Sequence, residues 1–210
     1  MATGKGGIVY MDTPGLADGK AGAERAAAEA ITNALRFGGW FKLCFIVRLE
    51  SGRVVSEDLV TMERVLDSIN LPNVPFSVII NDVSASMFKT LAKGEHEFER
   101  VVTLLNSGKY STPYFIFIPR FRKLVEADNR IVKLPRDIRD RIAQFPNVNI
   151  PPNAVAEIWT QGFTASVSTV DDKVKTLQKN ESAMKIVQVN LEKKHPNFWK
   201  TAFTALMLVE

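Results

Sequence analysis

Short apolar runs alternate with segments of helical character along the first 120 residues of the chain. Runs that combine β-branched and aromatic residues are predicted to be buried strands, and they occur at residues 7–11, 40–49, 76–80 and 112–118. The segments between them are rich in alanine or carry apolar residues at helical spacing, which predicts helices at 21–37, 56–69 and 86–108. This alternation predicts an α/β fold with a mainly parallel sheet, right-handed crossovers and helices on both faces.

The last 60 residues lack this alternation and are predicted to form a helical extension. Residues 168–194 are predicted to be one long helix, in which one apolar position recurs every seven residues: Val170, Leu177, Met184 and Leu191. A coiled coil needs a second apolar position in each heptad, and here that position is mostly polar, so a packed terminal helix is favoured over a coiled-coil dimer seam. A final short helix carries an apolar stripe that would dock on the body or lie on a membrane: Trp199, Ala202, Phe203 and Leu206. We therefore expect an α/β domain at residues 1–150 and a helical extension at 151–210.

Composition narrows the class of protein. The chain has 210 residues, of which 46% are hydrophobic and 24% charged, as in globular proteins. Its net charge of +4 is too mild to argue for nucleic-acid binding. The basic segment at 120–141 holds much of the excess and could meet anionic lipid, which would make the protein a peripheral membrane protein. Cys44 is the single cysteine, and neither a signal peptide nor a complete transmembrane run is evident, so a cytoplasmic location is expected.

The clearest candidate for chemistry is the turn that follows the first apolar run, with the sequence Asp12, Thr13, Pro14 and Gly15. Pro14 fixes φ and Gly15 permits positive φ, so the chain is expected to turn sharply there. A carboxylate at the carboxyl end of a buried strand lies where open α/β sheets bind ligands, and it suits a hydrated Mg²⁺. The alternative is an ordinary Asx or Pro-Gly turn without a ligand.

Three features together resemble an AIG-type G domain, from the immunity-associated, GIMAP-like branch of the P-loop GTPases. They are the strand and turn at 7–16, the strand at 43–47 that leads to GRVVSED at 52–58, and the strand that ends at Asn81. The resemblance covers roughly residues 7–120. It implies a GTPase-like sheet, binding of GTP or GDP with Mg²⁺, probable hydrolysis, and self-association as a switch. It also implies that Asp12 holds the hydrated metal ion, that residues 12–15 contact phosphate with Gly15 on the γ-phosphate, and that Asn81 lies in the base pocket.

The chain departs from this family at two points. The Walker A loop is absent, so the domain is expected to be an N-terminally incomplete, partial P-loop GTPase-like sheet, with a gap or with the Asp12 strand paired directly to the Cys44 strand. Ser84 stands where the family has its base-reading carboxylate, and a hydroxyl cannot accept both hydrogen bonds from guanine.

Two functions therefore stay open. The first is a GTP-binding protein of the AIG-type family. The alternative is a pseudo-GTPase that acts as a protein-interaction module without nucleotide. Self-association would use the G domain or the 168–194 helix. No catalytic residue is identified, and enzymatic activity stays an open question.

Overall fold

A computed structural model describes residues 2–3, 9–16, 23–93, 95–125 and 132–204. Its central sheet has four strands in the order β5-β4-β6-β7. Strands β4 (Cys44–Glu50), β6 (Ser77–Val83) and β7 (Phe115–Pro119) are parallel, and β5 (Arg53–Val54) pairs antiparallel with the end of β4. Ser51 and Gly52 both have positive φ, at 50° and 79°, as a two-residue hairpin turn requires. The predicted α/β fold with a mostly parallel sheet is confirmed at this level.

The first apolar run is not part of this sheet. Strand β2 (Val9–Tyr10) pairs antiparallel with β1 (Ala2–Thr3) in a separate two-stranded sheet. Val9 and Tyr10 are 39% and 61% exposed, so the prediction of a buried strand there is wrong, as is its direct pairing with the Cys44 strand. The physical reason is that a short apolar run has the same composition whether a sheet encloses it or solvent covers it.

The predicted strand at 40–49 is also two strands. Strand β3 (Gly39–Phe41) pairs antiparallel with β8 (Val148–Ile150), and β4 begins at Cys44. Gly38 and Gly39 have positive φ at the end of α1 (Ala23–Arg36), so the chain turns directly from that helix into β3. The short 3-10 helix η2 (Pro152–Ala154) follows β8.

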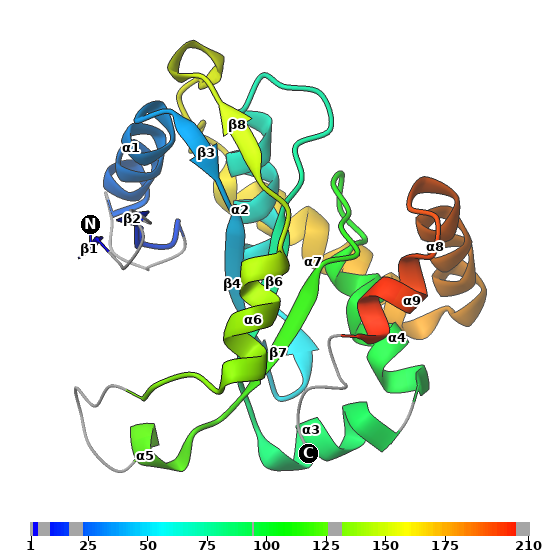
Figure 1. The fold of residues 1–210 in the computed structure, drawn as a ribbon. Coiled ribbons are helices and arrows are strands. Elements are labelled where there is room, and N and C mark those ends of the chain that lie inside the picture. The colour runs from blue at the N-terminus through cyan, green and yellow to red at the C-terminus, as the bar shows by residue number, and fades with distance from the viewer. Residues whose placement is uncertain (1, 4–8, 17–22, 94, 126–131, 205–210) are drawn as a thin grey trace.

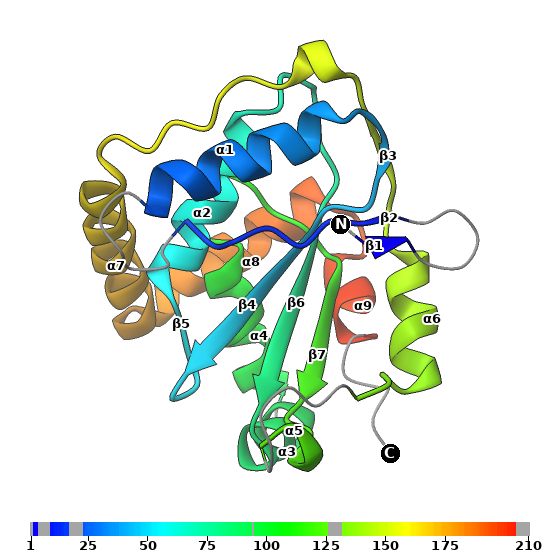
Figure 2. The same cartoon turned by 90° about the vertical axis from the view of Figure 1, so that its left-hand side faces the viewer.

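The two faces of the central sheet are covered unequally. Alternate side chains of β6 and β7 pack against α2 (Ser56–Asp67) and α4 (Glu95–Leu105), including Val78, Ile80, Phe115 and Phe117. On the opposite face Ile79 and Ile116 pack against Ile138 of α6 (Arg136–Gln144). Figure 2 shows α6 beside β7, while Ile46 on β4 is 64% exposed. Helices thus cover both faces, but β4 is partly open on one of them.

The C-terminal helices share the core of the sheet. The predicted single helix is interrupted at Asn180, giving α7 (Phe163–Lys179) and α8 (Glu181–Lys194). The Asn180 side chain accepts a hydrogen bond from the Ala183 N–H at 3.0 Å and caps α8. Leu177, Met184 and Leu191 are buried in the same cluster as the sheet, so the heptad positions serve the protein's own core instead of a dimer seam.

Helix α9 (Phe198–Phe203) completes this layer, which Figure 1 shows on one side of the sheet with α4 and α8. Phe198 and Ala202 are fully buried, so the apolar stripe of α9 docks on the body and is not available for membrane insertion. Leu206 lies outside the described residues. Among the described residues, no helix combines the length and the hydropathy needed to cross a bilayer.

Candidate functional site at the carboxyl edge of the sheet

Strands β4, β6 and β7 end at the same edge of the sheet, and two adjacent cavities lie there. The first has a volume of about 430 Å³ and lies between the β4–β5 turn and helix α3 (Ala85–Lys93), lined by Ser51, Gly52, Ser84, Ser86, Met87 and Thr90. The second has a volume of about 300 Å³ and lies toward helix α5 (Arg122–Val125), lined by Arg48, Asn81, Pro119, Phe121 and Leu124. Parallel α/β sheets bind ligands at this edge.

Asp82 and Arg120 line both cavities. The Arg120 guanidinium donates from Nε to Asp82 Oδ1 at 2.8 Å and from Nη2 to Asp82 Oδ2 at 2.9 Å, a two-bond ion pair. A β-bulge produces this pairing, because the register of β6 against β7 shifts between Ile80 and Val83, and Asp82 takes a φ of 60°. The hydrogen bonds from Arg120 lower the pKa of Asp82, and the positive charges of Arg120 and Arg48 act in the same direction.

The first turn of α3 supplies hydroxyl groups to the first cavity. Ser84 Oγ accepts a hydrogen bond from the Met87 N–H at 3.2 Å and so caps the helix. The hydroxyls of Ser84 and Ser86 lie 3.1 Å apart. Arg48 is exposed, and it pairs in register with Asn81 on the neighbouring strand. Together, hydroxyl groups and two guanidinium groups make this edge suitable for an anionic ligand.

The structure places only one of the sequence-predicted site residues at this edge. Asn81, which lies within β6, lines the second cavity. Asp12, Thr13, Pro14 and Gly15 follow β2, and Figure 2 shows this segment crossing toward α1 near the amino-terminal ends of β4 and β6. Leu16, which is 1% exposed, fixes the segment in a second apolar cluster with α1 and α2. The predicted phosphate and base contacts are therefore not brought together.

This arrangement does not fit the Mg²⁺ that the family resemblance implies. The Asp12 carboxylate is exposed, and its segment lies at the end of the sheet opposite to the cavities. The described residues hold no group of three or more His, Cys, Asp or Glu side chains that could bind a metal ion. We therefore derive no step through a metal ion at Asp12.

Arg48 and Arg120 are the site residues that sequence reasoning missed, and it did not predict that Asp82 pairs with Arg120. Arg120 begins the basic segment at 120–141, but its partner depends on a bulge that leaves no local sequence signal. The change from apolar to charged residues near the end of β4 was a usable signal for Arg48, which lies close to the predicted turn at Ser51 and Gly52.

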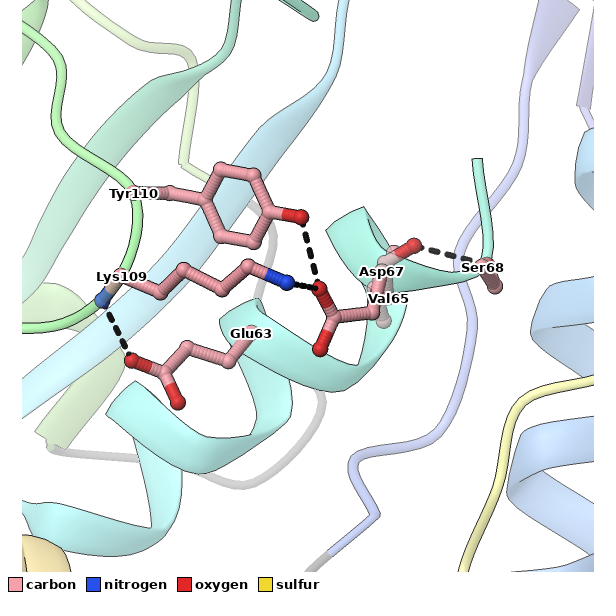
Figure 3. Close-up of polar contacts among 6 residues, drawn as sticks. All are labelled: Glu63, Val65, Asp67, Ser68, Lys109 and Tyr110. Carbon is pink, nitrogen blue, oxygen red and sulfur yellow. Dashed lines mark hydrogen bonds and ion pairs between the residues drawn. The ribbon is translucent and has the colours of Figure 1, made fainter. Parts of the chain in front are cut away.

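A second cluster of titratable groups lies outside the cavities (Figure 3). The Asp67 carboxylate accepts a hydrogen bond from the Tyr110 hydroxyl at 2.6 Å and pairs with the Lys109 ammonium, while the Glu63 carboxylate accepts from the Lys109 backbone N–H at 2.6 Å. These contacts join α2 to the loop that leads into β7. Because no cavity adjoins them among those described above, we assign this cluster a structural role.

Comparisons with family models, with curated proteins and with solved structures find no match to this chain. The resemblance to AIG-type G domains thus rests on the sequence motifs alone.

Proposed function

We propose that this chain binds a guanine nucleotide at the carboxyl edge of its sheet and does not hydrolyse it. The observation that carries this proposal is the convergence of Asn81, Arg48 and Arg120 on adjacent cavities at the ends of three parallel strands. The guanidinium groups suit phosphate, and Phe121 and Leu124 offer an apolar surface for a base. The choice of guanine rests on the AIG-type resemblance at Asn81, which is a fold-level analogy.

Absence of hydrolysis follows from the position of the 12–15 segment. Phosphoryl transfer depends on groups that position the terminal phosphate and stabilise its developing charge. In the AIG-type resemblance these groups include the turn at 12–15, which lies away from the cavities. Without this turn at the ligand, binding is expected to be weak, with a dissociation constant on the order of 100 µM.

Titration of the purified chain with fluorescent GTP, GDP and ATP, with and without Mg²⁺, tests this function. We expect guanine-selective binding that Mg²⁺ does not strengthen and that Asn81→Ala weakens. Asn149→Ala is the matched control, because Asn149 is an exposed asparagine on β8, away from the cavities. Binding that requires Mg²⁺ and is lost in Asp12→Ala would mean that the 12–15 turn contacts the nucleotide. It would overturn the proposal that this turn lies away from the bound ligand.

The second candidate is a protein-interaction module without nucleotide binding. The groups nearest the expected base site already have partners within the protein, since the Asp82 carboxylate is bound to Arg120 and the Ser84 hydroxyl caps α3. This favours a module that binds no nucleotide. The exposed Ile46 on the open part of β4 is a surface for contact with a second copy of the chain. No nucleotide binding up to millimolar concentration, together with dimerisation in sedimentation that Ile46→Glu abolishes, would favour this candidate over the first.

A further inference from the structure

We propose that the Asp82–Arg120 ion pair is a latch, which a phosphate group opens by replacing the Asp82 carboxylate on Arg120, so that the two cavities become one site. The inference rests on the proposed function only in placing the ligand at this edge, and it does not depend on which base the ligand carries. The ligand class is a phosphate monoester with a planar or apolar body.

The position of the pair carries the first part of this inference. Asp82 and Arg120 are the residues that line both cavities, so the pair lies where the two cavities adjoin. Ligand pockets in proteins usually have volumes of about 300–1,000 Å³. Each cavity alone falls in the lower half of that range, at about 430 and 300 Å³, and the joined space gives a mononucleotide more room.

The chemistry of the guanidinium carries the second part. Arg120 presents two parallel N–H groups to the two oxygens of Asp82, at 2.8 and 2.9 Å. A phosphate offers the same pair of oxygens with more negative charge, so it can take the place of the carboxylate without a change in the donor geometry. Arg48, whose positive charge already acts on Asp82, lines the second cavity and would face the same phosphate.

Because both side chains are partly exposed, replacing the Asp82 carboxylate by a phosphate on Arg120 costs little free energy. The side chains of Arg120 and Asp82 are 50% and 33% exposed, and ion pairs of this kind contribute little to stability. The Arg120 backbone N–H donates to the Val83 carbonyl oxygen at 2.8 Å, so the backbone stays fixed while the side chain turns. On the far sides, hydroxyls of Ser84 and Ser86 and the apolar Phe121 and Leu124 complete the joined site.

Calorimetric titration of the full chain with inorganic phosphate, GMP, AMP and guanosine tests the latch. Asp82→Asn removes the competing carboxylate while suiting a φ of 60°, which asparagine adopts readily. We expect this variant to bind GMP and phosphate about threefold to tenfold more tightly than the unchanged protein, whereas Arg120→Gln binds them at least tenfold more weakly. In the Arg120→Gln background, Asp82→Asn is expected to give no gain.

The Asp171–Lys175 pair on α7 supplies matched controls, since it is a similarly exposed ion pair that lines neither cavity. Asp171→Asn and Lys175→Gln make the same changes in net charge and are expected to leave binding unchanged. An unchanged or weaker affinity in Asp82→Asn overturns the latch, as does an equal gain in the Arg120→Gln background. Tighter binding of GMP and AMP alike in Asp82→Asn supports the latch while removing guanine selectivity, so the two proposals fail separately.

Discussion

The Asp58 carboxylate in the first turn of α2 lies beside the Arg48 backbone N–H near the end of β4, and this N–H favours its ionised form. Burial raises the pKa of Asp58 to about 6 from its ordinary value of 3.8. The Arg48 N–H opposes this rise, and the charges of Glu57 and Glu50 add to it. The carboxylate thus lies between the helix and the strand, but it carries a charge that its surroundings disfavour at neutral pH.

Replacing Asp58 is expected to change how stability depends on pH. The pKa of Asp58 is higher in the folded protein than in the unfolded chain, so the folded protein binds the proton of this carboxyl group more tightly. The contribution of Asp58 to the free energy of unfolding therefore falls as pH rises from about 4 to 6. Asp58→Asn retains an oxygen beside the Arg48 N–H, but without the charge. We expect it to be more stable than the unchanged protein at pH 7.5 by about 1–2 kcal/mol.

Urea unfolding at pH 4 and pH 7.5 measures this difference. The gain in Asp58→Asn should shrink at pH 4, where the native carboxyl group is largely protonated. Glu57→Gln is the control for loss of a neighbouring negative charge. If Asp58→Asn is less stable than the unchanged protein at pH 7.5, the ionised carboxylate is favoured by its surroundings, and the argument from burial is wrong.

The parts of the fold that were predicted correctly are those that local patterns determine. Strands β6 and β7 carry near-continuous apolar runs at 78–80 and 115–118, as strands buried on both faces of a parallel sheet do. The break between α7 and α8 was missed, although Asn180 followed by Glu181 is a helix start with an acidic first turn. The seven-residue repeat concealed it, because the buried positions keep the same spacing on both sides of the break.

The candidate site was predicted only in part, because its geometry depends on contacts between distant segments. The change from apolar to polar residues near the end of β6 is visible in the sequence, and Asn81 lines the second cavity there, while its contact with a base stays a prediction. The pairing of Asp82 with Arg120 depends on a bulge between β6 and β7. The displacement of residues 12–15 depends on β2 pairing with β1 instead of joining the central sheet. Neither event leaves a pattern within a single segment.

Gly108 has too little space for a side chain, and Gly108→Ala tests the contacts drawn in Figure 3. A Cβ at this position would lie 2.5 Å from Glu63 Oε1, which accepts the hydrogen bond from the Lys109 N–H. The Glu63 side chain must move and lose that bond, so we expect a loss of about 1 kcal/mol in the free energy of unfolding. In a Glu63→Ala background the same change should cost nothing or stabilise slightly. Equal costs in both backgrounds would contradict the contact.

Asn180→Ala tests whether the capped break between α7 and α8 stabilises the protein. The variant loses the side-chain oxygen that accepts from the Ala183 N–H, so we expect a loss of about 1 kcal/mol in the free energy of unfolding. Asn180→Asp keeps an acceptor and should restore most of it. Asn190→Ala, at an exposed position within α8, is the matched control and is expected to be neutral or slightly stabilising. A more stable Asn180→Ala would indicate that one continuous helix is preferred.

Phe198→Ala tests whether the C-terminal helices and the sheet form one cooperative core. Phe198 is fully buried, its ring lies edge-on to Trp199 with the centroids 4.8 Å apart, and both residues belong to the cluster that packs on the sheet. Removal of a buried phenylalanine ring typically costs about 3–5 kcal/mol, and we expect that loss here with a single unfolding transition.

Urea unfolding followed by both circular dichroism and tryptophan fluorescence would measure the effect of Phe198→Ala. Ile186→Ala is the control, because Ile186 is 63% exposed on α8, and its change should stay within about 0.5 kcal/mol. Two separate transitions, or a loss below about 1 kcal/mol in Phe198→Ala, would mean that α9 is not part of the core. Its apolar stripe would then again be a candidate for membrane contact. Coincident transitions together with a large loss in the free energy of unfolding would instead mean that the C-terminal helices and the sheet unfold as one unit.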